Sequence, residues 1–251
     1  MRRAAQDRRR RAISRLAVGS AATVVVVAVS AVVARAASER LPPEQVRTVL
    51  RTTVRLAGRD PALPWPARGE AALALGAGGL IGTSGPSAPL PTASVAKVMT
   101  AYLVLRDHPL APGRPGFVIT VTPAQAAGFR QRLADGESLL RVHAAETLTE
   151  WQALQALLLA SADNIADILA EDDAGTVGAF VAKMNAAAHA LGMTHTLFTD
   201  PSGLDPRTAS DATDLLPLAQ AAMAVPAFAA LVDERQADIP GVATFGNYDT
   251  L

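Results

Sequence analysis

A serine and a lysine in an apolar stretch could carry nucleophilic chemistry. Ser94 and Lys97 lie three residues apart within residues 93–105 (ASVAKVMTAYLVL), so in a helix both side chains would lie on one face. A serine hydroxyl needs a neighbouring base, and a desolvated lysine that loses its proton can be that base. The spacing therefore favours covalent catalysis by Ser94 with Lys97 as general base. The alternative is a chance spacing, with a lysine that extends its amine to solvent.

The choice of lysine at this position is itself informative. Lys97 and Lys183 are the two lysines among 23 basic residues, so composition predicts arginine here. Arginine cannot surrender a proton in a protein, whereas a buried lysine can. Ser94 would also lie at a helix N-terminus, where backbone N–H groups and the helix dipole favour a developing negative charge.

A second polar group interrupts two apolar helical runs at residues 161–164 (SADN). Such a break is a natural place for side chains to project into a cleft. From the residues alone, the alternative is a simple helix junction in which Ser161 is the N-cap of the next helix.

The elements that must position these groups can be read along the chain. Residues 93–105 are apolar on nearly all sides, which predicts a helix buried in a core. Residues 70–75 and 79–83 predict two strands joined by a tight turn. A further helix is expected after Thr122, and another from a capping box at Thr147 and Glu150 through Ala160. Two more are expected, one over residues 175–190 and one from an N-cap at Ser210 to about Ala224. Strands followed by a helical block predict an α+β fold.

The N-terminal region has the pattern of an export signal. Residues 1–15 contain seven arginines and one acidic residue, and residues 16–34 contain no charged residue. A helix of that length reaches about 28 Å against a hydrocarbon core of about 30 Å. We expect a cytoplasmic Arg-rich segment followed by a transmembrane signal-anchor, or by a cleaved signal peptide. Residues 35–68 would be a proline-containing stem, with a short helix between Pro43 and Ala57.

Several classes of function are disfavoured by composition. The chain has no cysteine, which excludes disulfides, Cys-ligated metals and thiol nucleophiles. After residue 15 the acidic residues outnumber the basic ones, which argues against a nucleic-acid partner. The four histidines form no His-Glu-x-x-His pair. We therefore expect no metal and no organic cofactor.

Three segments resemble one enzyme family. Residues 91–101 (PTASVAKVMTA), 148–154 (LTEWQAL) and 198–205 (FTDPSGLD) are similar to segments of the serine D-alanyl-D-alanine carboxypeptidases, the low-molecular-mass penicillin-binding proteins of peptidase family S11. The resemblance runs from about Arg68 to about Val232. It implies a β-lactamase/transpeptidase-like fold over residues 69–251, with an antiparallel sheet packed against a mainly helical lobe.

The resemblance also implies roles and partners. Ser94 would attack the peptide bond of a peptidoglycan stem peptide ending in D-Ala-D-Ala, Lys97 would take the serine proton, and Ser161 would relay a proton to the leaving amine. β-Lactams would be covalent inhibitors, and the chain would contact the membrane through its N-terminal helix. The catalytic domain would be extracytoplasmic on a single-pass anchor, or secreted after cleavage.

Two departures from the family pattern bear on activity. The family has asparagine two residues after the second serine, where this chain has Asp163 followed by Asn164; both are candidate substrate-binding residues. A carboxylate near Lys97 would favour its ammonium form, the wrong direction for a general base, unless Asn164 turns inward instead.

The second departure is that no Lys-Ser-Gly or Lys-Thr-Gly occurs in the 251 residues. The resemblance then implies an incomplete domain without its C-terminal strands, inactive or severely impaired. The alternative is a noncatalytic, membrane-anchored cell-wall binding or scaffold domain of the same fold.

Overall fold

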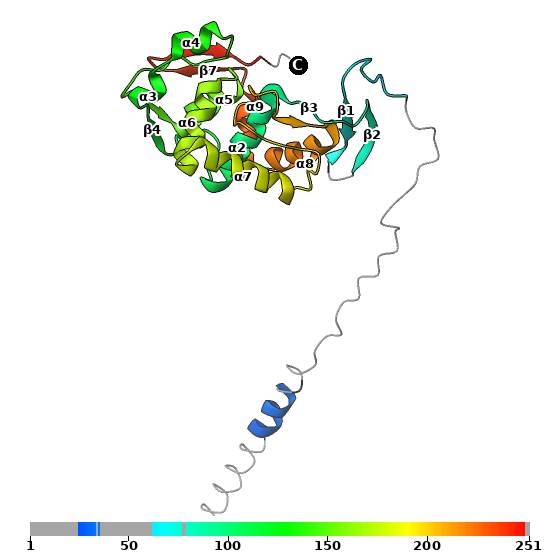
Figure 1. Ribbon diagram of the computed structural model, residues 1–251. Helices are drawn as coiled ribbons and strands as arrows, with labels where there is room; N and C mark the ends of the chain where they lie inside the picture. The colour runs from blue at the N-terminus through cyan, green and yellow to red at the C-terminus, as the bar shows by residue number, and fades with distance from the viewer. Residues whose placement is uncertain (1–24, 34, 36–61, 77–78, 249–251) are drawn as a thin grey trace, which may run out of the picture. The chain divides into compact units, whose positions relative to one another are not determined.

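The computed structural model describes residues 25–33, 35, 62–76 and 79–248 (Figure 1). The chain divides into two compact units, Met1–Pro61 and Ala62–Leu251.

In the first unit the described residues, 25–33 and 35, are helical, and all of them except Arg35 fall inside the predicted span 16–34. The rest of that span, the Arg-rich segment 1–15 and the helix predicted between Pro43 and Ala57 lie outside the described residues. Among the described helices, none alone has the length and hydropathy needed to cross a bilayer; one bent pair, Ala212–Met223 with Pro226–Asp233 at 100°, passes that test jointly.

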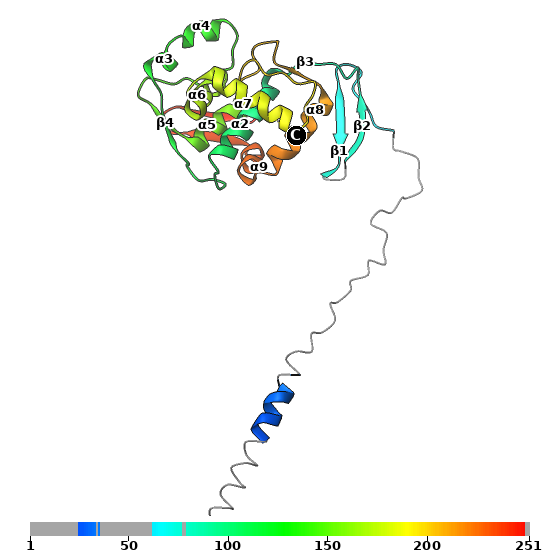
Figure 2. The same cartoon turned by 60° about the horizontal axis from the view of Figure 1, so that its bottom comes forward.

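The second unit is built around one buried helix, α2 (Ala96–Asp107), which follows a single 3-10 turn, η2 (Ala93–Val95). The other larger helices pack around α2, as both views show (Figures 1 and 2). Most of α2 is inaccessible to solvent, so the predicted core helix is confirmed. The helices around it are α5 (Glu150–Leu158), α6 (Asp163–Ala174), α7 (Val177–Ala190), α8 (Ala212–Met223) and α9 (Pro226–Asp233).

The described strands form four antiparallel pairs. The predicted hairpin is present as β1 (Ala71–Ala74) and β2 (Leu80–Ser84). The other pairs are β3 (Leu90–Pro91) with β6 (Ala209–Ser210), β4 (Val118–Thr120) with β5 (Thr147–Thr149), and β7 (Gln236–Ile239) with β8 (Ala243–Gly246). Helices and antiparallel strands in one unit make this an α+β fold, as predicted.

Two predicted helix starts are wrong by one or two residues. The capping box of α5 joins Thr149 to Gln152, not Thr147 to Glu150, because Thr147 to Thr149 first pair with β4 as a strand. The N-cap of α8 is Asp211, not Ser210, since the Asp211 carboxylate accepts the Asp214 N–H.

Two short helices, α3 (Pro123–Ala126) and α4 (Phe129–Ala134), follow β4 and lead to residues 138–140. The capping box at Thr122 opens α3, as the sequence predicts. The α3 and α4 segment matters for the site because residues 138–140 contact the start of α6.

Candidate active site

Ser94 and Lys97 are brought together where η2 runs into α2. The Lys97 ammonium donates to Ser94 Oγ at 3.0 Å. Ser94 is exposed, whereas Lys97 is 2% exposed. Ala93, just before the serine, has a φ of 46°, a left-handed conformation that costs a residue with a Cβ and is common at functional sites. The predicted one-turn spacing therefore produces a direct contact between amine and hydroxyl.

Lys97 has two further partners besides Ser94. Its Nζ donates to Asp163 Oδ1 at 2.6 Å and to the Ser202 carbonyl at 3.1 Å. An ammonium group has three N–H donors, and here three acceptors surround it. Ser94 Oγ, Asp163 Oδ1 and the Ser202 carbonyl oxygen thus supply an acceptor for each of those donors.

Ser161 lies between α5 and α6 and reaches the same hydroxyl. Its Oγ donates to Ser94 Oγ at 2.8 Å. Ser161 has a φ of 56°, the left-handed region again, which a sharp turn between two helices requires. The polar break predicted between two apolar helices is confirmed, and it brings Ser161 to Ser94.

Asp163 and Asn164 point to different neighbours. Asp163 Oδ2 accepts the Ser138 N–H at 3.0 Å, while its own N–H donates to the Ser138 carbonyl at 2.7 Å. Asn164 donates to the Leu140 carbonyl at 2.8 Å and accepts the Leu140 N–H at 3.0 Å. Asn164 therefore does not turn toward Lys97, and Asp163 takes that place.

The loop at residues 200–205 supports α2 from the other side. Thr100, one turn after Lys97, donates to the Pro201 carbonyl at 2.6 Å. Gly203 has a φ of 81°, and a Cβ there would lie 1.7 Å from the Ala93 carbonyl oxygen. This close approach fixes the Ser202 carbonyl under Lys97, a contact that helical periodicity alone did not reveal.

A pocket of about 230 Å³ opens beside Ser94, Lys97 and Ser161. Its opposite wall includes Phe228 and Val232 from α9 and Asn247 after β8. Sequence reasoning did not name these three as site residues, because they lie more than 130 positions from Ser94. The wall is mostly apolar, which suits a ligand with a small aliphatic side chain beside the hydroxyl.

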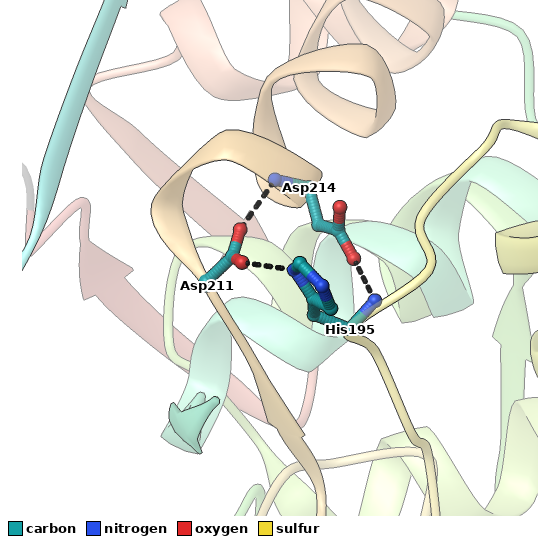
Figure 3. Close-up of side chains that lie close together, drawn as sticks. All are labelled: His195, Asp211 and Asp214. Atoms are coloured by element: carbon teal, nitrogen blue, oxygen red, sulfur yellow. Dashed lines mark hydrogen bonds and ion pairs between the residues drawn. The ribbon is translucent and has the colours of Figure 1, made fainter. Parts of the chain in front are cut away.

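One group of side chains in the described residues has a metal-like composition (Figure 3). His195, Asp211 and Asp214 offer ligand atoms within 4.8 Å of one another. However, Asp211 accepts from the Asp214 N–H at 2.8 Å and contacts His195 Nδ1 at 2.7 Å, and Asp214 accepts from the His195 N–H at 2.6 Å. These bonds cap α8 and hold the turn at His195, so we interpret the group as structural.

The comparisons with known proteins identify the family of this chain. A family model described as D-alanyl-D-alanine carboxypeptidase, peptidase S11, matches residues 73–237. The chain belongs to this family. Among curated members, the carboxypeptidase DacB2 of Mycobacterium tuberculosis is 37% identical over 153 residues, 60% of this chain and 48% of that protein. A D-alanyl-D-alanine endopeptidase of Pseudomonas aeruginosa is 34% identical over 142 residues, 56% of this chain and 42% of that protein.

Solved structures of peptidase S11 relatives share the fold. A D-alanyl-D-alanine carboxypeptidase from M. tuberculosis superposes with a TM-score of 0.64 and 30% identity, covering 78% of this chain and 72% of that one. The Streptomyces K15 DD-transpeptidase gives a TM-score of 0.63 and 25% identity, covering 72% and 73%. The chain spans a little under half the length of the curated relatives it matches.

Proposed function

We propose that this S11 member is a serine-type D-alanyl-D-alanine carboxypeptidase that works through a Ser94 acyl-enzyme. The observation that carries the proposal is the contact of Ser94 Oγ with both Lys97 Nζ, at 3.0 Å, and Ser161 Oγ, at 2.8 Å, at the edge of an open pocket. A nucleophile within hydrogen-bond reach of a base and of a second proton carrier is the arrangement that acyl transfer needs.

The proposed reaction has two halves. Ser94 Oγ attacks the carbonyl carbon between the two terminal D-alanines while its proton passes to uncharged Lys97. The C–N bond then breaks, and the leaving amine receives that proton by way of Ser161. Water next attacks the Ser94 ester and releases the shortened peptide. The Ser94 N–H, at the turn into α2, is the proposed first donor to the oxyanion.

The substrate of the proposed reaction is a peptidoglycan stem peptide ending in D-Ala-D-Ala, and β-lactams would acylate the same serine. We place the domain outside the cytoplasmic membrane, held by a helix within residues 16–34 or released after its cleavage. Because no Lys-Ser-Gly or Lys-Thr-Gly occurs in the 251 residues, we expect slow turnover of peptide by this chain.

A second candidate is a cell-wall binding or scaffold domain without turnover. The salt bridge between Lys97 and Asp163, at 2.6 Å, favours it, because it engages the amine that would have to accept the Ser94 proton. The hydrogen bonds of Ser94 Oγ with Lys97 and Ser161 favour the carboxypeptidase.

Labelling of the full 251-residue chain with a fluorescent penicillin separates the two candidates. We expect a covalent adduct in the wild type and none in Ser94→Ala, with D-alanine release from a model pentapeptide as the second measurement. An adduct that forms equally in Ser94→Ala would refute acylation at Ser94. No adduct in a wild-type sample with a cooperative thermal transition would refute the carboxypeptidase proposal.

A further inference from the structure

Residues 138–140 are attached to the start of α6 by four hydrogen bonds. Ser138 exchanges two with Asp163, one through the Asp163 carboxylate, and Leu140 exchanges two with the Asn164 amide. Asp163 is the residue that contacts Lys97 Nζ. The position of residues 138–140 thus helps to set the position of a carboxylate in the candidate site.

A cluster of three charged side chains lies directly beside this attachment. Arg132 of α4 donates its Nε to Glu137 Oε2 at 2.7 Å, and a terminal guanidinium nitrogen lies 3.0 Å from Asp167 Oδ2 on α6. Glu137 immediately precedes Ser138, and its N–H donates to the Arg132 carbonyl. We call Arg132, Glu137 and Asp167 the Arg132 clasp.

The clasp and the site share one face of α6. Asp163 and Asp167 are four residues apart in that helix, so their side chains lie one turn apart on the same side. Asp163 accepts a hydrogen bond from the Ser138 N–H, and Asp167 forms an ion pair with Arg132. Arg132 also pairs with Glu137, the residue immediately before Ser138. The ion pairs of the clasp, the peptide bond between Glu137 and Ser138, and the hydrogen bonds of Asp163 therefore connect the clasp to Lys97 and Ser94.

We propose that Arg132 and Asp167 are positioning residues that fix Ser138 against Asp163, and through Asp163 hold Lys97 in place beside Ser94. This proposal rests on the proposed acylation of Ser94. It assigns a part in the reaction to α4 and to the second turn of α6, although neither Arg132 nor Asp167 lines the pocket beside Ser94.

The charges around Asp167 make the clasp sensitive to pH. The pKa of Asp167 is raised to about 6, chiefly by burial; Arg132 opposes the rise, and the charges of Glu137 and Asp200 add to it. Glu171, on the next turn of α6, is bonded to Gln125 of α3. Because the folded-state pKa is raised, the fold favours neutral Asp167. Its ionisation, as pH rises from 3.8 to about 6, costs stability and creates the charged clasp.

Because the fold favours neutral Asp167, the variant Asp167→Asn is informative. Asparagine mimics the neutral form that the fold prefers, so at neutral pH the variant should fold at least as stably as the wild type while lacking the ion pair with Arg132. The matched control is Asp135→Asn. Asp135 lies at the C-terminus of α4, exposed, and bonds Gln131 at 2.9 Å.

The experiment measures two quantities on the full chain. We expect penicillin acylation of Asp167→Asn to be about tenfold slower than wild type at about pH 7.5, with the ratio approaching one near pH 5, where wild-type Asp167 is protonated. Taking the ratio cancels titration of groups common to both proteins. Hydrogen exchange at the Ser138 and Asp163 amides should be about tenfold faster in the variant. Asp167→Glu should recover most of the rate, and Asp135→Asn should match wild type.

Three outcomes overturn parts of the inference separately. Unchanged exchange at Ser138 and Asp163 refutes the structural coupling. Faster exchange with a rate ratio that is near one, or independent of pH, refutes the positioning role. A folded wild type that takes no label refutes the proposed function and the positioning role with it, while exchange still decides the coupling. If Asp167→Asn fails to fold, Arg132→Gln undergoes the same two measurements.

Discussion

The two lysines of this chain make their contacts at opposite ends of α2, and their surroundings differ. Lys97, in the first turn, donates to Ser94 Oγ, to Asp163 and to the Ser202 carbonyl. Lys183 comes from α7 and binds Asp107, the last residue of α2, together with the buried Asp173 of α6. Both lysines therefore form salt bridges with carboxylates that belong to the helical core.

The difference between them lies in what else each amine meets. The further contacts of Lys97 include a hydroxyl at the edge of a pocket, while Lys183 Nζ lies over the Phe180 ring, 5.7 Å from its centroid. We conclude that a paired lysine by itself says little about function. A lysine that shares its proton donors between a carboxylate and an exposed hydroxyl marks the candidate site.

Replacing each lysine with methionine tests this comparison most directly, and Lys97→Met should have the largest effect. Lys97→Met keeps the length of the side chain but removes the base, so we expect penicillin acylation of Ser94 to fall by about 10³-fold. The measurement is the second-order rate of fluorescent labelling, with a melting curve as the control for folding. A folded variant that retains acylation within threefold would remove Lys97 from the reaction.

Two glycines sharpen the contrast between the site and the rest of the unit. Gly203 and Gly192 have φ values of 81° and 78°, but only at Gly203 would a Cβ meet backbone, the Ala93 carbonyl. We expect Gly203→Ala to lower the free energy of unfolding by about 3 kcal/mol and to slow acylation, and Gly192→Ala to cost about 1 kcal/mol without affecting acylation. If urea unfolding gave the same loss of unfolding free energy for both variants, the close approach of Gly203 to the Ala93 carbonyl would be contradicted.

Lys183→Met should change stability and not chemistry. Removing the ammonium leaves Asp173, whose side chain is 1% exposed, with the His108 ring, at 3.4 Å, in place of a lysine. We expect a loss of about 2 kcal/mol in unfolding free energy, with acylation of the folded protein within twofold of wild type. A large fall in acylation would break the distinction between the two ends of α2.

The effect of Lys183→Met should itself depend on pH. Partial burial alone would raise the pKa of Asp107, but bonds to Arg106 and Lys183 outweigh it and lower that pKa. This stabilisation is present above the ordinary value of 3.8 and is lost as pH falls through the folded-state value. The difference between wild type and variant should therefore shrink below about pH 4, as thermal melts from pH 7 to pH 3 would reveal.

The smallest expected effect concerns the partner of Lys97. Asp163→Asn can still accept the Ser138 N–H, but it removes the negative charge 2.6 Å from Lys97 Nζ. Because the variant removes the anion that attracts the Lys97 amine, we expect acylation at neutral pH to become about tenfold faster. A slower rate would mean that the carboxylate assists the reaction, and an unchanged rate would mean that its charge does not affect acylation.

Helix starts illustrate where local pattern failed. The sequence contains a capping box at Thr147 and Glu150 and another at Thr149 and Gln152, and both satisfy the same local chemistry. Pairing of Thr147 to Thr149 with β4, more than 25 residues away along the chain, decided between them. A cap is a choice among neighbouring polar residues, and tertiary contacts make that choice.

The sequence by itself determined the α+β class, the core helix and the Ser94–Lys97 pair, since these depend on helical periodicity and on spacing within one turn. It also indicated Ser161, through the resemblance to the family's second motif, since the polar break alone equally fits a helix junction. Only the tertiary structure decided that Asp163 and not Asn164 faces Lys97, that Gly203 holds the Ser202 carbonyl beneath it, and that α9 and Asn247 close the pocket. Those contacts join residues tens of positions apart, and hydrophobic packing of the helices around α2 sets them, not the local preferences of the residues involved.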